Sequence, residues 1–316
     1  MIGESQLRLL SYLATESNSE VPISTLADQL GWSTGHTSRI VSDLEARGCI
    51  RTTESGRHKL TKLSDIEPVA QLQALMTEYG HVDFPQLVAG SGLRLLYYLD
   101  RRRTATELAE VSDLSRATVY RRLNDLQAVG IIGKSKSHYE LNDPFSKLSS
   151  IARGLAHHEH RREAERRADR VNILWETHEE YLFASDSELD RDGFFLTGPS
   201  LFAEFDIPLL TRNRRHYFHS DRITGVSSAD LVCHTLLIDD DSRYRTYCLL
   251  LIQRETIGWT TLRERAKYYE QEADIDLLTI ITDLVAYLET GGRIPSDRLP
   301  SWEDFKSTAA DYEINV

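Results

Sequence analysis

The stretch SRATVYRRLNDLQAVGII, residues 115–132, predicts one helix and the turn that ends it. Val119, Leu123 and Leu126 recur at helical spacing and form a single apolar stripe. Gly130 follows at a place where a helix commonly ends and the chain reverses. Several polar residues fall off the stripe: Arg116, Thr118, Arg121 and Arg122. We therefore expect a helix with an apolar back and an arginine-bearing front.

The same pattern occurs once more, earlier in the chain. A shift of 82 residues aligns STLADQLGWSTGHTSRIVSDLEARGCI (24–50) with TELAEVSDLSRATVYRRLNDLQAVGII (106–132), and no gap is needed from Leu26 onward. The identical pairs include Ser33 with Ser115, Arg39 with Arg121, and Gly48 with Gly130. A repeat of this kind indicates two copies of one supersecondary unit.

Both copies have the same predicted order of elements. A leucine-striped helix comes first, then a short helix (23–30 or 105–111), a tight turn, and a longer helix that begins at Ser33 or Ser115 as its N-cap. Two strands joined by a polar turn follow, at 49–63 and 131–141. Three helices and a β-hairpin form a winged helix-turn-helix domain. We name residues 1–65 the first module and residues 86–143 the second module.

This pattern resembles the archaeal and bacterial winged-helix regulators of the MarR, TrmB and IclR families. In such a domain the second helix of the pair enters the major groove, where arginine can bind guanine bidentately. The resemblance implies DNA contacts from the second module by Ser115, Arg116, Thr118, Tyr120, Arg121 and Arg122, and from the first by Ser33, Thr34, His36, Ser38 and Arg39. The hairpins would bind the backbone or minor groove through cations that include Arg57, Lys59, Lys134 and Lys136.

A winged helix also serves protein contact or dimerisation, so the fold by itself leaves both uses open. RATVYRR in the second module has three arginines where the first module has only Arg39. We therefore expect double-stranded DNA to bind the second module, and leave open whether the first module also binds it. Lysine supports this expectation, because five of the seven lysines lie between residues 59 and 147.

Two further helices are expected around the second module. Residues 66–85 predict a connecting helix that begins near Pro68 and packs through Leu72, Leu75 and Met76. Residues 144–183 predict a linker helix that begins at Pro144. Its HHEH stretch (157–160) suggests a metal site, but no companion ligand cluster is evident. We expect a solvated helix of mixed charge, with no metal and no cofactor.

Acidic residues are concentrated in the C-terminal half. Residues 1–150 contain 17 basic and 18 acidic residues, a net of −1, whereas residues 151–316 contain 20 and 31, a net of −11. Acid excess with few lysines is typical of a high-salt cytoplasm, as in haloarchaea, and a GC-rich genome also favours arginine over lysine. No apolar run of membrane length and no secretory signal are present, so we expect a cytoplasmic protein. The three scattered cysteines indicate no disulfide framework or zinc site.

Residues 184–316 predict an α+β domain. GFFLTGPSLFAEFDIPLL (193–210) predicts a strand, a glycine turn and a helix, while LVCHTLLIDD (231–240) and YRTYCLLLIQRET (244–256) predict strands. The first of these stretches resembles the opening of nucleotidyltransferase-like domains and of the C-terminal domain of AbiEi-type antitoxins. A catalytic nucleotidyltransferase holds Mg²⁺ with an Asp-x-Asp pair on the next strand. This region has only Asp221, and Asp239–Asp241 are expected at a hairpin tip. We therefore expect no catalysis.

The expected fold is α+β, with two winged helix-turn-helix domains, a linking helix and a C-terminal α+β domain. We expect a sequence-specific DNA-binding transcriptional regulator, a repressor, that forms a homodimer and binds an effector or partner protein through residues 184–316. The alternatives are a DNA-binding protein of plasmid or virus replication or partition, or a nucleotidyltransferase-like enzyme tethered to nucleic acid.

Overall fold

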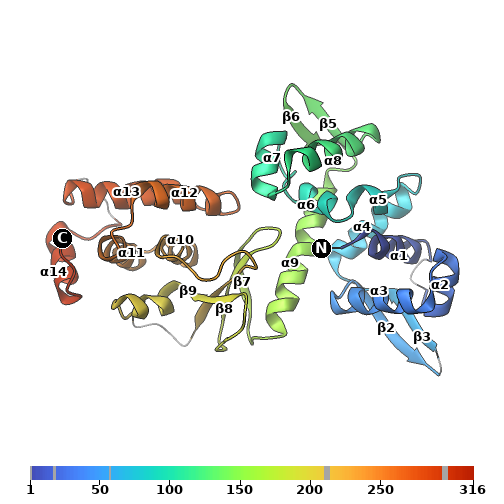
Figure 1. Cartoon of the computed structure of the whole chain (residues 1–316), viewed down its shortest axis with the longest axis horizontal. Coiled ribbons are helices and arrows are strands. Elements are labelled where there is room, and N and C mark those ends of the chain that lie inside the picture. The colour runs from blue at the N-terminus through green and yellow to red at the C-terminus, as the bar shows by residue number, and fades with distance from the viewer. Residues whose placement is uncertain (1, 17–18, 57, 210–213, 294–297) are drawn as a thin grey trace. The chain divides into compact units, whose positions relative to one another are not determined.

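A computed structural model of the chain describes residues 2–16, 19–56, 58–209, 214–293 and 298–316. The chain divides into two compact units, residues 1–162 and 163–316. The division falls inside helix α9 (Lys147–Glu165). Within the described residues, the first unit has two three-stranded sheets and the second unit has one four-stranded sheet (Figure 1).

The first and second modules have the same order of elements. The first contains α1 (Glu4–Thr15), β1 (Val21–Pro22), α2 (Ile23–Leu30), α3 (Thr34–Ala46), β2 (Ile50–Ser55) and β3 (His58–Leu63). The second contains α6 (Ser91–Tyr97), β4 (Arg103–Thr104), α7 (Ala105–Ser112), α8 (Arg116–Ala128), β5 (Ile132–Ser135) and β6 (His138–Leu141). Their antiparallel sheets have the matching orders β1-β3-β2 and β4-β6-β5.

Local sequence explains how the paired helices begin and end. Both predicted serine N-caps are confirmed, because Ser33 Oγ accepts from the backbone N–H of His36 and Ser115 Oγ from that of Thr118. The turn before each cap needs a left-handed residue, which is Gly31 in the first module and Asp113 in the second. Helices α3 and α8 therefore begin from the same local geometry.

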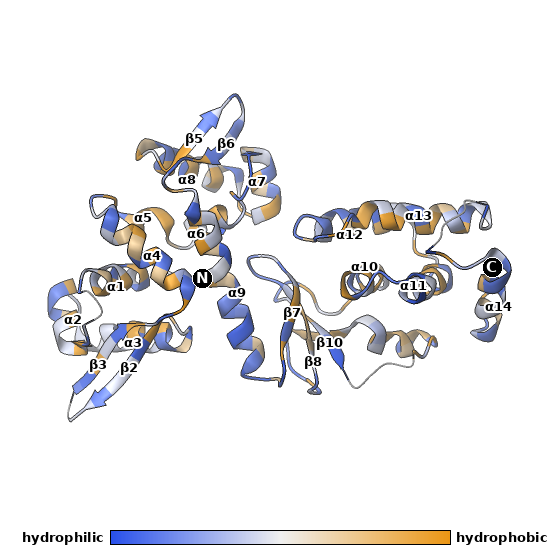
Figure 2. Cartoon of the chain, turned by 180° about the vertical axis from the view of Figure 1, so that it is seen from behind, coloured by the Kyte–Doolittle hydropathy of each residue, from blue (hydrophilic) through white to orange (hydrophobic). Residues whose placement is uncertain are grey.

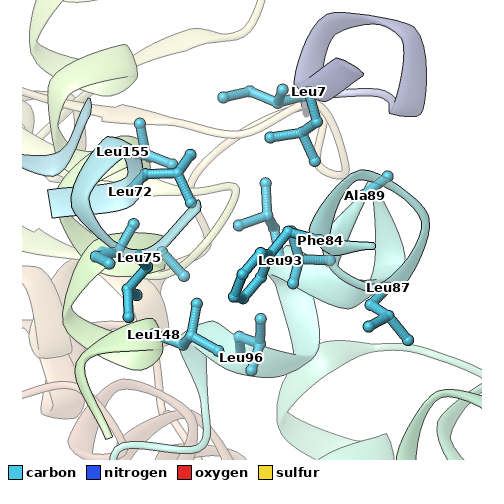
Figure 3. Close-up of a cluster of buried hydrophobic side chains, with 14 of the residues drawn as sticks. Leu7, Leu72, Leu75, Phe84, Leu87, Ala89, Leu93, Leu96, Leu148 and Leu155 are labelled. Atoms are coloured by element: carbon cyan, nitrogen blue, oxygen red, sulfur yellow. The ribbon is translucent and has the colours of Figure 1, made fainter. Parts of the chain in front are cut away.

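One buried cluster of apolar side chains runs through both modules. Helices α4 (Glu67–Glu78), α5 (Phe84–Val88) and α9 contribute to it. Figure 3 shows Leu72 and Leu75 of α4, Phe84 of α5 and Leu148 and Leu155 of α9 in this cluster. The expected connecting helix is thus present as α4, which ends at Glu78, and its predicted core residues are buried.

The linker helix predicted over 144–183 is too long. Helix α9 ends at Glu165, and β7 (Asn172–Glu176) and β8 (Tyr181–Ser185) occupy the rest of that range. Leu174 and Trp175 fit a helical spacing with Val171, but both lie in β7, and Val171 directly precedes that strand. The pairing of β7 with β8 shifts register between Ile173 and Trp175, and this irregularity disguises the two-residue alternation of a strand.

The second unit pairs an antiparallel sheet, order β7-β8-β10-β9, with helices. Its further elements are β9 (Phe194–Thr197), the 3₁₀ helix η1 (Gly198–Phe205), β10 (Arg215–His219), α10 (Ser228–Ile238), α11 (Ser242–Arg254), α12 (Trp259–Glu270), α13 (Leu277–Thr290) and α14 (Trp302–Asp311). Figure 2 shows that apolar residues occupy much of α10 and the faces of α12 and α13 that meet it. The second unit is therefore a mixed α and β domain, as expected.

Two strands predicted in this unit are helices. Residues 231–240 lie mostly in α10 and residues 244–256 mostly in α11. Both helices have caps: Ser227 and Asp230 form a capping box on α10, and Asp241 accepts from the backbone N–H of Tyr244 on α11. Buried helices lack a polar face, so a short apolar run does not distinguish them from buried strands. Asp239–Asp241 consequently join two helices and form no hairpin tip.

None of the helices within the described ranges combines the length and apolar character needed to cross a bilayer.

Candidate nucleic-acid interface

Helix α8 has one buried face and one exposed face. Val119, Leu123 and Leu126 are buried, which confirms the apolar stripe. Arg116 and Arg121 are exposed, and within the described residues they make no hydrogen bond or ion pair. Tyr120 is also exposed, with 49% of its surface accessible. The second module therefore presents arginine and tyrosine side chains on a helix that is anchored from behind.

The first turn of α8 is fixed by its own polar side chains. Ser115 Oγ and Thr118 Oγ1 lie 2.9 Å apart, and Ser115 also caps the helix. Both side chains lie at the N-terminal end of α8, where a recognition helix contacts DNA. Exposed amide donors and a favourable helix dipole suit this end to a phosphate oxygen.

Arg122 differs from its neighbours, because its guanidinium turns back onto the module. Nε donates to Ser91 Oγ at 2.8 Å, and the terminal nitrogens donate to the carbonyls of Gln86 and Ala89, each at 3.2 Å. These contacts join α8 to the α5–α6 segment. We therefore correct the predicted role of Arg122 from DNA contact to positioning of α8.

Arg122→Ala is expected to destabilise the first unit by about 2 kcal/mol, because it removes three charge-assisted hydrogen bonds. Arg121→Ala is the matched control, because it removes an arginine from the exposed face of the same helix. We expect this variant to leave stability nearly unchanged. Urea unfolding followed by circular dichroism measures both. Equal midpoints for the two variants would contradict the positioning role.

The second hairpin exposes cations near its tip. Lys134 lies over the ring of buried Tyr139, 5.1 Å from its centroid, and keeps its ammonium group exposed. Lys136 lies in the turn with a φ of 55°. Their charges are available to the phosphate backbone, which fixes the register of a DNA-binding domain without specifying bases.

The first module presents a weaker set of candidates. Ser33 is the N-cap, Thr34 is exposed, Ser38 is half-buried, and the ring of His36 packs edge-on against Trp32 at 5.1 Å. Arg39 is exposed and, like Arg121, has no hydrogen-bond or ion-pair partner among the described residues.

Carboxylates accompany the cations of the first hairpin. Lys59 pairs with Glu45 at 3.0 Å, Arg51 with Asp65 at 2.8 Å, and Lys62 with Glu20 at 3.7 Å. Arg57 lies outside the described residues. The first hairpin is therefore closer to neutral than the second, and we expect it to contribute less to phosphate binding.

The HHEH stretch of α9 packs against the first module. Glu159 pairs with Arg47, and Arg162 Nε donates to the carbonyl of Ala46 at 3.2 Å. Within the described residues, no group of three or more His, Cys, Asp or Glu side chains is placed to hold a metal ion.

Two of the carboxylates considered for catalysis, Asp240 and Asp241, have structural partners. The carboxylate of Asp240 accepts hydrogen bonds from Arg245 Nε at 2.6 Å and from the guanidinium of Arg298 at 2.7 Å. Asp241 caps α11. Asp221 is exposed just beyond β10.

One exposed residue on α8 was missed by the sequence analysis. Asn124 lies one turn after Arg121, and its side chain makes no hydrogen bond within the described residues. At about 100° per residue, positions 117, 121 and 124 lie opposite the buried stripe. This geometry is the signal that could have identified Asn124 from the sequence.

Three family models match parts of the chain. The IclR helix-turn-helix domain matches residues 88–135, which include α6 to β5. A domain of unknown function, DUF7343, matches residues 16–64, and the model HVO_2833_C, described as C-terminal, matches residues 191–314. None of the curated proteins or solved structures compared with the chain gives a match. The chain thus contains an IclR-type helix-turn-helix domain, which points to a DNA-binding transcriptional regulator.

Proposed function

We propose that the chain is a sequence-specific transcriptional regulator in which both modules are winged helix-turn-helix domains and α8 is a recognition helix. The exposed face of α8 is the observation that carries this proposal. The guanidinium groups of Arg116 and Arg121 make no hydrogen bond or ion pair with any residue that the structure describes, and they lie on a helix whose back is packed. A free guanidinium on such a face can bind guanine O6 and N7, or a phosphate.

The second hairpin supports the same assignment. Lys134 and Lys136 place positive charge beside α8, on the element that contacts the backbone or minor groove in winged-helix domains. The chain is strongly acidic overall, so these cations form a local exception.

We propose that the chain acts on DNA without catalysing a reaction, that it represses transcription, and that it forms a homodimer in the cytoplasm. The second unit would serve an effector or a partner protein. Transcription from a bound promoter in the presence and absence of the chain tests repression, and sedimentation of the free chain tests the oligomer. Occupancy at an origin instead of promoters would favour the replication or partition alternative.

The double variant Arg116→Ala/Arg121→Ala is expected to lose at least about 30-fold in affinity for a selected duplex, since each bidentate arginine contributes about 1–3 kcal/mol of discrimination. Stability should stay close to that of the unmodified chain, because neither side chain has a hydrogen-bond or ion-pair partner in the part of the chain that the structure describes. Fluorescence anisotropy at one fixed salt concentration measures the affinity.

Arg263→Ala is the matched control, because Arg263 is an exposed arginine on α12 that also lacks a hydrogen bond or ion pair within the described residues. We expect binding within about twofold of the unmodified chain for this variant. An unchanged affinity in the double variant would remove the basis of the proposed function.

A further inference from the structure

We infer that a single chain recognises a composite DNA site of two non-identical half-sites, one contacted by α3 and the other by α8. This inference rests on the proposed function and extends it to the first module. Arg39 would contact a guanine in the α3 half-site, and Arg121 would contact a guanine in the α8 half-site. Asn124 would contact an adenine in the α8 half-site alone.

The first argument is the equivalence of the two exposed helix faces. The 82-residue shift places Arg39 on Arg121 and Ser42 on Asn124. All four side chains are exposed, and each pair lies opposite the buried stripe of its helix, which is Thr37, Val41 and Leu44 in α3. Helices α3 and α8 also begin from equivalent serine caps, so the two arginines occupy the same place in their modules.

The second argument is that these arginines lack partners in a first unit where most cations are engaged. Arg47, Arg51 and Arg122 all bind carboxylates, carbonyls or a hydroxyl. Arg39 and Arg121 make no hydrogen bond or ion pair with any described residue. Both modules thus leave the same central arginine free, although the remaining surface of the first module is less basic.

The third argument is that a shared core holds the modules together. Ile2 accepts a hydrogen bond from the backbone N–H of Gly90 at 3.0 Å, which joins the start of the first module to α6. Ser149 of α9 donates to the carbonyl of Tyr97 in the second module, while Glu159 of the same helix pairs with Arg47 in the first. One helix therefore binds both modules.

Figures 1 and 2 show the β2–β3 and β5–β6 hairpins projecting from opposite ends of the first unit. Two recognition helices fixed by one core, with hairpins on opposite sides, can engage two separate segments of a duplex. Because the second binding event is then intramolecular, a site with both half-sites gains affinity without any new contact.

The fourth argument concerns the difference between the two faces. Arginine prefers guanine and asparagine prefers adenine, whereas serine accommodates several bases. Ser42 replaces Asn124 and Ser38 replaces Tyr120 in the first module. The two half-sites therefore share a dG but differ in the neighbouring base, and only the α8 half-site requires a dA.

In vitro selection with the full chain tests this inference, using random duplexes of about 30 bp, long enough for two half-sites a helical turn or more apart. We expect the selected sequences to contain two different half-sites, each with a conserved dG. A duplex with both should bind at least about 100-fold more tightly than a duplex with one, and titration should saturate at one composite duplex per chain.

Single variants assign the half-sites. Arg39→Ala should relax the dG of one half-site and Arg121→Ala that of the other, each with a loss of about 10- to 100-fold in affinity. Asn124→Ser should abolish the dA preference in the α8 half-site alone, and the reciprocal Ser42→Asn should create a dA preference in the α3 half-site.

The outcomes separate this inference from the proposed function. If Arg121→Ala weakens binding while Arg39→Ala changes neither affinity nor the selected sequence, the composite site is disproved and the proposed function stands. If neither variant changes the affinity or the selected sequence, the composite site and the proposed function are both disproved. Two short duplexes bound per chain, with no gain when their half-sites are joined, would overturn the composite site by showing that the modules bind separate DNA molecules.

Discussion

Replacing Asp230 with alanine is expected to destabilise the second unit by about 3–5 kcal/mol, the cost typical of removing one partner of a buried ion pair. Asp230 is 7% exposed. It accepts from Arg265 Nε at 2.5 Å, from the Tyr269 hydroxyl at 2.9 Å and from the Ser227 hydroxyl at 2.6 Å. The variant would leave the half-buried guanidinium of Arg265 without its carboxylate and would remove the capping box of α10.

Asp276→Ala provides the matched control in the same unit. Asp276 is exposed and caps α13 by accepting from the backbone N–H of Thr279 at 3.0 Å. Losing this exposed cap should cost clearly less than losing the buried pair. Chemical unfolding of both variants measures the contrast, and a loss for Asp230→Ala no larger than that for Asp276→Ala would show that the buried pair contributes little.

Acid is expected to destabilise the second unit through His234. This side chain is fully buried, and burial lowers its pKa to about 3. The Thr197 hydroxyl lies 2.8 Å from Nδ1, and the Tyr269 hydroxyl lies 2.8 Å from Nε2. Tyr269 donates to Asp230, so we assign the ring proton to Nε2, which donates to Tyr269, and Thr197 then donates to Nδ1.

The sign of the pH effect follows from where the proton binds. In the unfolded chain His234 titrates near its ordinary pKa of 6.5, whereas in the folded unit it stays neutral down to about pH 3. The unfolded state thus binds the extra proton over this range. The stabilisation by neutral His234 is complete above pH 6.5 and is lost at about 1.4 kcal/mol per pH unit between pH 6.5 and 3.

His234→Gln tests the acid prediction, because glutamine keeps hydrogen-bonding capacity but does not titrate. The variant should be less stable than the unmodified chain at pH 7, and this difference should shrink as the pH falls from 6.5 toward 4. Burial also lowers the pKa of His216, to about 4, so the variant retains part of the acid sensitivity. Parallel curves of unfolding free energy against pH for the two proteins would refute the assignment.

Local signals were enough to predict the three helices and the hairpin of each module, but not the short elements α5, β1 and β4. The serine caps, the left-handed turn residues and the apolar stripes of α3 and α8 depend only on neighbours within a few positions. The second unit was harder, because α10 and α11 are buried on nearly all sides and lack the periodicity that marks a helix. Strand β7 was hidden for a different reason, the irregular pairing beside Trp175.

The residues of the candidate site could likewise be predicted from the sequence only in part. Arg121 could be placed on the exposed face because helical geometry puts it opposite the stripe. Arg116 lies three residues before Val119, on the side of the stripe, and it is exposed at the first residue of α8. Arg122 could not be placed, because its partners lie about 31–36 positions away in the α5–α6 segment. The carboxylates opposite Arg51, Lys59 and Lys62 likewise become visible only when the chain is folded.

The position of α9 decides where the first unit can be separated from the second by proteolysis or by recombination of the gene. A fragment ending at residue 143 would lack Leu148, Ile151 and Leu155, which are buried in the core of the first unit. Such a fragment would expose the apolar surface of α4 and α6 that α9 covers, and exposed apolar surface promotes aggregation. A fragment that folds as the first unit must therefore include α9 up to its contacts with the first module. A different C-terminal domain could be joined to the first unit only after those contacts.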